Sequence, residues 1–244
     1  QAILAGYLAF AGERRALVDL GAASADAGEA WLCHLNGFAW LGDLRAVGSD
    51  QARHHARRLT TSWIRAHGHW SALPWRPEVT AQRLINWLTH FGFFAADARE
   101  EFRLTLYTEL ARQARHLARN AGKAASSSKR ITSLKGLIYC GVSLPGCDKF
   151  LHQGLRQLGL ELHRQILPDG GHISRNPSIH LQLLSDLIAV TETLAAAHLE
   201  QPAWLKDSVR LMAPMLRSLR LGDGGLGLFN GGAMEDADVI DQIL

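Results

Sequence analysis

The residues best suited to chemistry gather in one segment, 169–180, which reads DGGHISRNPSIH. It places two imidazoles, His172 and His180, with the guanidinium of Arg175 and the amide of Asn176 on a turn that leads into the start of a helix. A helix N-terminus offers unpaired N–H groups and positive potential, and both suit a carboxylate. Either histidine could serve as a general base or acid. In the alternative interpretation, these polar residues only cap and brace the turn, and His180 packs at the helix start.

A second segment, GDGGLG at 222–227, formally matches the dinucleotide-binding pattern G-x-G-x-x-G. It follows a helical rather than a strand-like stretch, so we predict no nucleotide cofactor and expect a glycine-rich turn that brings Asp223 and Asn230 near a groove. The histidines at 54–55 and at 67 and 69 lack the H-E-x-x-H pattern, and adjacent histidines point to different faces of a helix. We therefore expect no metal site and no cofactor in this chain.

Composition narrows the classes of partner. A chain of 244 residues, 47% hydrophobic and 20% charged, is typical of a globular protein with a large buried core. The formal net charge of +3 suits an acidic partner but falls short of a nucleic-acid-binding signature. No stretch approaches the roughly eighteen consecutive apolar residues of a membrane span, so we predict no transmembrane helix. The three cysteines form no C-x-x-C motif, which removes zinc-knuckle and thioredoxin-type sites.

The positions of the apolar residues predict helices throughout. They recur at intervals of three and four, and strand signals are scarce. Ser49 and Asp50 can cap one helix, and Pro77 suits the first turn of another. We predict an all-α protein of antiparallel helical hairpins, in one domain over 1–244 with an irregular lead-in over 1–25. The expected helices cover 27–44, 50–68, 77–91, 97–120, 131–142, 148–166, 177–198 and 203–220.

Tryptophan is concentrated in the first part of the chain, where 31–87 holds all but one of the seven. An indole plane matches the apolar C–H face of a sugar ring, and it also fills the core of large helical proteins. The helical positions of Trp40, Trp63 and Trp87 favour the core. Trp70 and Trp75 fall in an expected loop, where binding and packing are both open.

Three stretches together resemble the heparinase II/III-like polysaccharide lyases, and in particular the proteobacterial members of that group. The stretch 31–94 is similar to the family's opening pattern, with Asn36, Trp63, Trp75 and Arg83 at matching points. The stretch DGGHISRNPSIHLQLLSDL is similar to the family's Asp-Gly-x-His and Ser-Pro-x-Tyr-His segment. The third is the glycine-rich GDGGLGLFNGG. The resemblance covers most of the chain.

The resemblance implies an (α/α) toroid, here an incomplete ring, with the family's β-sandwich domain outside this chain, beyond residue 244. The implied reaction is β-elimination on a uronic-acid polysaccharide. One group neutralises the carboxylate, a base removes the acidified C5 proton, and an acid, often Tyr, protonates the leaving O4. The implied partner is an acidic polysaccharide. The implied compartment is the periplasm, while the residues themselves leave the cytoplasm open.

Site residues follow from the segment chemistry and the resemblance together. The expected catalytic residues are His172, Asn176 and His180. The expected substrate-binding residues are Lys129, Arg130, Arg175, Asn36, Trp75, Arg83, Asp223 and Asn230.

The chain departs from the family pattern at positions that matter for catalysis. Ile179 stands where the family has Tyr, Ser174 where it has Glu, and Ser128-Lys129 where it has Asn-His. Tyr139 is a possible substitute acid. Three functions therefore remain open: a lyase, a catalytically inactive module that binds a glycan or the cell envelope, and a helical scaffold that binds another protein.

Overall fold

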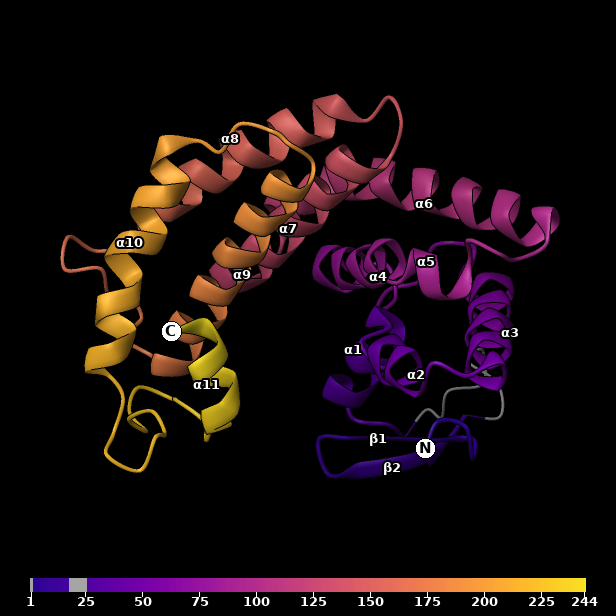
Figure 1. The fold of residues 1–244 in the computed structure, drawn as a ribbon, viewed down its shortest axis with the longest axis horizontal. Coiled ribbons are helices and arrows are strands. Elements are labelled where there is room, and N and C mark those ends of the chain that lie inside the picture. Colours follow the sequence, from indigo (N-terminus) through magenta and orange to yellow (C-terminus); the bar gives the residue numbers. More distant parts are fainter. Residues whose placement is uncertain (1, 18–25) are drawn as a thin grey trace. The chain divides into compact units, whose positions relative to one another are not determined.

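The fold is helical apart from one short hairpin, which confirms the predicted all-α class. A computed structural model describes residues 2–17 and 26–244. These residues form two compact units, Gln1–Ala124 and Ala125–Leu244. Figure 1 shows the order of their elements along the chain.

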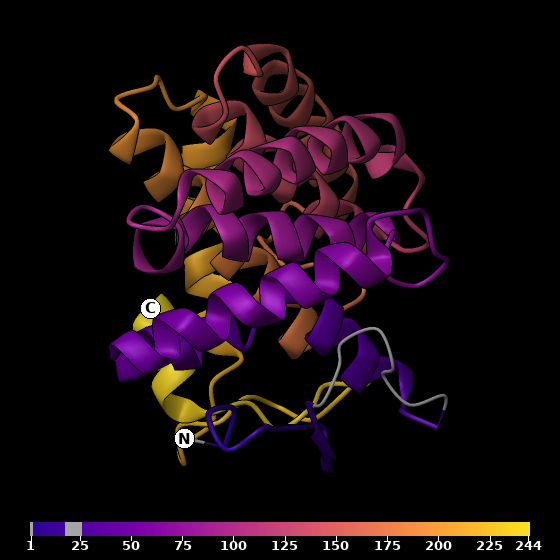
Figure 2. The same cartoon turned by 90° about the vertical axis from the view of Figure 1, so that its right-hand side faces the viewer.

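Unit 1 holds the hairpin and the first six α-helices. Its elements are β1 (Tyr7–Phe10), β2 (Glu13–Ala16), α1 (Glu29–Gly37), α2 (Leu41–Val47), α3 (Asp50–His67), α4 (Pro77–Thr89), α5 (Phe91–Phe94), α6 (Glu100–Asn120) and the 3₁₀ turn η2 (Ala121–Lys123). Helix α4 packs against α1 and α6. Figure 2 shows α4 and α6 running side by side.

Unit 2 holds the remaining helices. They are α7 (Ser127–Ser143), α8 (Asp148–Gln165), α9 (Pro177–Ala196), α10 (Ala203–Ser218) and α11 (Ala237–Ile243). Helix α7 packs against α8 and α9, and α9 packs against α10. The approach of α7 and α8 depends on glycine, because a Cβ added at Gly141 would lie 2.2 Å from the backbone nitrogen of Leu151.

Local sequence signals explain where several helices begin. The Ser49 hydroxyl accepts a hydrogen bond from the Ala52 amide at 3.1 Å and caps α3. Pro77 occupies the first turn of α4, where its missing N–H costs nothing. The Asn176 side chain caps α9 by accepting from the Ile179 amide at 3.0 Å.

Two expectations about the first part of the chain were wrong. The helix predicted over 27–44 breaks into α1 and α2, because Phe38 ends α1 in the left-handed conformation with φ 58°. The irregular lead-in predicted over 1–25 contains an antiparallel hairpin with Tyr7 opposite Ala16. Its turn places Ala11 and Gly12 at positive φ, as tight hairpin turns require. Positions 1 and 18–25 lie outside the described residues.

A buried guanidinium organises the core of unit 1. Arg83 is fully buried, and its Nη1 donates to the carbonyl oxygens of Asn36 at 2.8 Å and Pro74 at 3.0 Å. Its Nε donates to the Gln113 side chain at 2.7 Å, and its Cζ lies 4.0 Å from the centroid of the Trp63 ring. Burial lowers the pKa of Arg83 to about 9, so the group stays charged at neutral pH.

The tryptophans expected in the core are there. Trp40, Trp63 and Trp87 are fully buried, and each lies against the ring of Phe38. These edge-on and tilted ring contacts join α1, α3 and α4 into one apolar layer.

Helix α9 is the one described helix that is long and apolar enough to cross a membrane by length and composition. In unit 2 it packs against α7 and α10 and carries the buried polar side chains His180 and Asp186. Both features are typical of a core helix.

Replacing Arg83 by Met should lower the free energy of unfolding by about 3 kcal/mol, because the carbonyl and amide oxygens around it would stay buried without a donor. Urea unfolding followed by tryptophan fluorescence measures the loss. The exposed Arg115 on α6 provides the control, since Arg115→Met should change stability by less than about 0.5 kcal/mol. Equal losses in the two variants would contradict this role for Arg83.

Candidate functional site

The segment 169–176 forms a tight turn between α8 and α9. The Asp169 carboxylate accepts from the Gly171 amide at 3.0 Å and from Arg175 Nη1 at 2.7 Å. Gly170 has φ 83°, and a Cβ there would lie 2.2 Å from the Leu211 carbonyl oxygen. The turn is therefore pressed against α10, and its shape requires glycine.

His172 is buried, and both of its ring nitrogens are engaged. Nδ1 accepts from the Ser174 amide at 3.0 Å. Nε2 must then carry the proton, and it donates to the Gln165 side chain at 3.2 Å. Burial lowers the pKa of His172, and the nearby His180 lowers it further. A neutral imidazole bonded on both sides holds the turn in place.

His180 is 1% exposed and lies in the first turn of α9. Its Nε2 donates to the Met212 carbonyl oxygen at 3.0 Å. Its Nδ1 has no hydrogen-bond partner among the described residues. Burial is the main cause that lowers the pKa of His180, so the neutral form with an open acceptor prevails at neutral pH.

Asn176 and Asn230 join the turn to the glycine-rich loop. The Asn176 side chain donates to the Asn230 carbonyl oxygen at 2.9 Å, and the Asn230 side chain donates to the Arg175 carbonyl oxygen at 3.1 Å. Arg175 and Asn230 both have left-handed backbones, with φ 54° and 50°. This conformation costs Arg about 1 kcal/mol, which the surrounding bonds must offset.

The structure brings the predicted catalytic residues together around one cavity of about 150 Å³. Its polar lining is His172, Arg175, Asn176 and His180, and apolar side chains complete it: Met215, Leu219 and Phe229. Ligand pockets usually measure about 300–1,000 Å³. This cavity suits a small group rather than a length of polysaccharide.

A second cavity lies where the resemblance assigns catalytic groups. Ser128, His172 and Ile179 all line it, yet its volume is about 10 Å³, which is about the minimum for a single water. The remaining lining is Ile131, Gln165, Gln182, Leu183 and Asp186. The buried Asp186 carboxylate pairs with Lys135 at 2.8 Å.

The cations predicted to recognise a carboxylate are largely engaged within unit 2. Arg130 pairs with Glu161 at 3.4 Å, and Arg175 pairs with Asp169. Lys129 lies in the first turn of α7, and its backbone amide donates to the capping Ser126 hydroxyl. A guanidinium already neutralised by a carboxylate attracts a second carboxylate less strongly.

The other predicted binding residues occupy structural positions. Asn36, Trp75 and Arg83 are buried in the core of unit 1. Trp75 donates from Nε1 to the His67 carbonyl oxygen at 3.0 Å, whereas Trp70 is 72% exposed. In unit 2, Asp223 accepts from the Gly225 amide at 3.0 Å and shapes the glycine-rich turn.

Sequence reasoning missed the partners that engage the candidate site. Gln165 comes from the end of α8, and the Met212 carbonyl comes from the middle of α10. A lone Gln and a backbone oxygen carry no sequence signal. Tyr139, the possible substitute acid, has its hydroxyl 3.5 Å from the Ala189 carbonyl oxygen on the adjacent helix.

Known proteins match both the sequence and the fold. The family profile described as heparinase II/III N-terminus matches residues 51–243. The chain belongs to the heparinase II/III family. This confirms the resemblance found in the sequence. Heparan sulfate lyase HepC from Pedobacter heparinus matches with a TM-score of 0.76 and 17% identity, over 96% of this chain and 40% of that chain. Heparinase III matches with a TM-score of 0.78 and 16% identity, over 96% of this chain and 38% of that chain.

A relative that sequence comparison identifies is described in other terms than the lyase structures. FtsZ-localized protein C of Caulobacter vibrioides is 33% identical over 198 residues, which are 81% of this chain and 34% of the relative. The chain thus spans about a third of that relative's length. At 16–17% identity, the lyase structures establish the heparinase helical fold alone.

The depressed histidine pKa values predict how stability depends on pH. His172 and His180 bind a proton more weakly when folded, so the unfolded chain takes up more protons below its pKa of about 6.5. Their contribution to stability should be full above about pH 6.5 and should fall as the pH drops toward their folded values. His34, His55, His90 and His116 act in the same direction.

Replacing His180 by Gln isolates its share, because Gln can still donate to the Met212 carbonyl. Between pH 7.5 and 5.5, the free energy of unfolding should fall less in the variant than in the parent chain. One unit of pKa depression at His180 corresponds to at most about 1.4 kcal/mol of this difference. Urea unfolding at each pH measures the difference. Parallel pH profiles for the two chains would show that His180 is not held neutral by burial.

Proposed function

We propose that this chain is a non-catalytic heparinase-fold module that acts by binding, and that its protein works with the FtsZ-based division machinery. One observation carries the first part. Ile179, at the position that the resemblance assigns to the family's Tyr, and Ser128, at the first position of its Asn-His pair, meet at a cavity of about 10 Å³ that Ile131 and Leu183 also line. β-Elimination needs a carboxylate neutraliser, a base and an acid around a sugar ring, and this space admits no sugar.

The state of the histidines supports the same proposal. A general base needs a free nitrogen that reaches the substrate proton. His172 has both nitrogens bonded inside the turn. His180 keeps Nδ1 open, but the residue is 1% exposed, its Nε2 is held by a backbone carbonyl, and the cavity that it lines measures about 150 Å³. Tyr139 lies against α9 and takes no part in the lining of either cavity. These groups stabilise the junction of α8, α9 and α10.

The second part of the proposal comes from the relative in Caulobacter, which is described as FtsZ-localized. Its match extends over 81% of this chain. A heparinase fold that has lost its catalytic groups but keeps its helical surfaces suits a protein-binding role. We extend FtsZ association to the protein that contains this chain, together with the β-sandwich domain that the resemblance implies.

Acidic-glycan binding is a second candidate, favoured by the cavity of about 150 Å³. There the open Nδ1 of His180 can accept from a sugar hydroxyl, and the spare N–H groups of Arg175 can donate to a carboxylate. The Phe229 ring offers an apolar face to a pyranose. The small volume limits this candidate to a single sugar unit.

Two measurements on the 244-residue chain test the proposal. Incubation with a panel of uronate polysaccharides should produce no absorbance from an unsaturated sugar. Sedimentation with polymerised FtsZ should carry the chain into the pellet, whereas unpolymerised FtsZ should leave it in the supernatant. Unsaturated product that His172→Ala abolishes would establish a lyase instead. Failure to pellet, combined with binding of a heparan sulfate oligosaccharide that Arg175→Ala weakens about tenfold, would favour the glycan candidate.

A further inference from the structure

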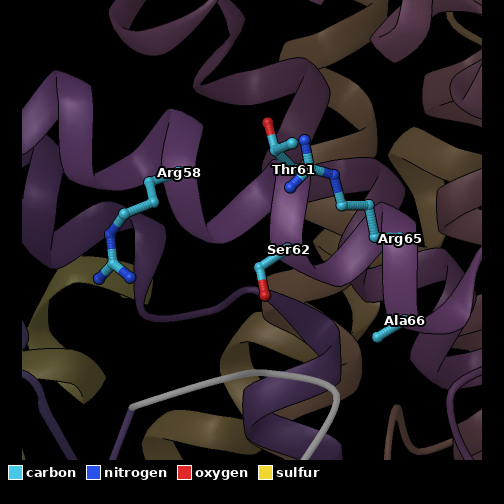
Figure 3. A pocket seen from close by; sticks show the side chains of 5 residues that line it. All are labelled: Arg58, Thr61, Ser62, Arg65 and Ala66. Atoms are coloured by element: carbon cyan, nitrogen blue, oxygen red, sulfur yellow. The ribbon is translucent and has the colours of Figure 1, made fainter.

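A cavity of about 470 Å³ lies on α3 in unit 1. Figure 3 shows its lining. The lining residues are Arg58, Thr61, Ser62, Arg65 and Ala66. This volume falls within the usual range for ligand sites. No carboxylate and no aromatic ring is among these lining residues.

The lining residues form one stripe along the helix. They recur at intervals of three and four, on the face opposite the buried Ala56, Leu59 and Trp63. Arg58 and Arg65 stand seven residues apart, about 10 Å along the axis at 1.5 Å per residue. The Arg65 side chain runs back along the helix toward Thr61. Two guanidinium groups thus flank two hydroxyls.

The two arginines of the stripe differ from the others on α3 in their partners. Arg53 pairs with Asp50 at 3.1 Å, and Arg57 pairs with Asp97. Within the described part of the chain, the Arg58 guanidinium contacts the His55 imidazole, at 3.2 Å, and no carboxylate. Arg65 forms no ion pair with any residue that the structure describes.

Among the residues that the structure describes, no carboxylate pairs with Arg58 or Arg65. Burial and the neighbouring Arg58 lower the pKa of His55, so this imidazole is neutral and balances no charge. Arg130 and Arg175, which were expected to bind an anion, each have a carboxylate partner instead. Arg58 and Arg65 are therefore more available to an anionic ligand than Arg130 and Arg175 are.

We infer that the stripe Arg58, Thr61, Ser62 and Arg65 is a docking site for an acidic segment of a protein partner. Guanidinium forks bind carboxylates in pairs of hydrogen bonds, and the Thr61 hydroxyl between them can donate to a further carboxylate or backbone oxygen. A sugar would favour an aromatic platform, and an apolar helix would need an apolar floor. Among the described lining residues, Ala66 alone is apolar. The inference rests on the proposed function, in which the partner is a protein.

The test uses the 244-residue chain and a fluorescein-labelled decapeptide of alternating Glu and Ser, with affinity read from fluorescence anisotropy. The double variant Arg58→Ala, Arg65→Ala should bind the peptide at least tenfold more weakly. The exposed Arg115 and Arg156 supply a control that removes the same charge elsewhere, and Arg115→Ala, Arg156→Ala should bind within about twofold of the parent chain. Lysine at 58 and 65 should give an intermediate affinity, because it keeps the charge but loses the fork.

Each other outcome overturns the inference. Equal weakening by the two alanine pairs would mean that the peptide responds only to net charge. Binding of a heparan sulfate oligosaccharide that depends on Arg58 and Arg65, without peptide binding, would assign the stripe to a glycan. FtsZ sedimentation separates the two proposals, because a stripe variant that still pellets with FtsZ but no longer binds the peptide leaves the proposed function intact. A stripe variant that binds the peptide like the parent chain shows that these arginines take no part.

Discussion

The Arg83 guanidinium is the interaction on which unit 1 depends. A charged group without water is tolerated only when its donors are used, and the carbonyls of Asn36 and Pro74 and the side chain of Gln113 use them. These acceptors come from α1, the loop before α4, and α6, so one side chain fixes the relative positions of three segments. The Trp63 ring beneath it completes the enclosure. Residues that a family comparison places near a substrate thus have a structural use in this chain.

Hydrogen bonds made within the protein also hold the polar side chains of the turn before α9. The side chains of His172, Asn176 and Arg175 form hydrogen bonds within the turn, with the end of α8 and with the glycine-rich loop. Polar groups committed to the fold in this way are stable, and they are also poorly placed to exchange protons with a substrate. Ile179, at the position that the resemblance assigns to the family's Tyr, has no ionisable group. The hydrogen bonds of this short segment therefore serve the fold.

Much of the fold could be predicted from the sequence, because its signals are local. Helix periodicity, the Ser49 cap and Pro77 located the helices to within a few residues. The break at Phe38 was not predicted, because packing among buried rings sets the left-handed backbone conformation of this residue and no local sequence pattern encodes it. The hairpin was not predicted, because each strand has only four residues and its turn is Ala11-Gly12, which lacks the usual Asn-Gly or Asp-Gly signal.

The candidate site was predicted in part. Convergence of polar residues at 169–180 was visible in the sequence, and four of them do line one cavity. The sequence could not predict which groups bond to the two histidines, because Gln165 and the Met212 carbonyl reach the site only through tertiary packing. The pairing of Arg130 with Glu161, across α7 and α8, is equally non-local. Residue type predicts the chemistry that is possible, and the partners decide what remains available.

We conclude that His172 and His180 serve the fold as neutral imidazoles, with both nitrogens of His172 and Nε2 of His180 bonded internally. Nitrogen-15 NMR of the imidazoles in the 244-residue chain tests it directly, because the shifts report the protonation and tautomer of each ring. We expect His172 and His180 both to carry the proton on Nε2 at pH 7, to titrate below the usual histidine range, and to keep their shifts when a heparan sulfate oligosaccharide is added. Titration at or above about 6.5, or a shift on adding the glycan, would contradict it.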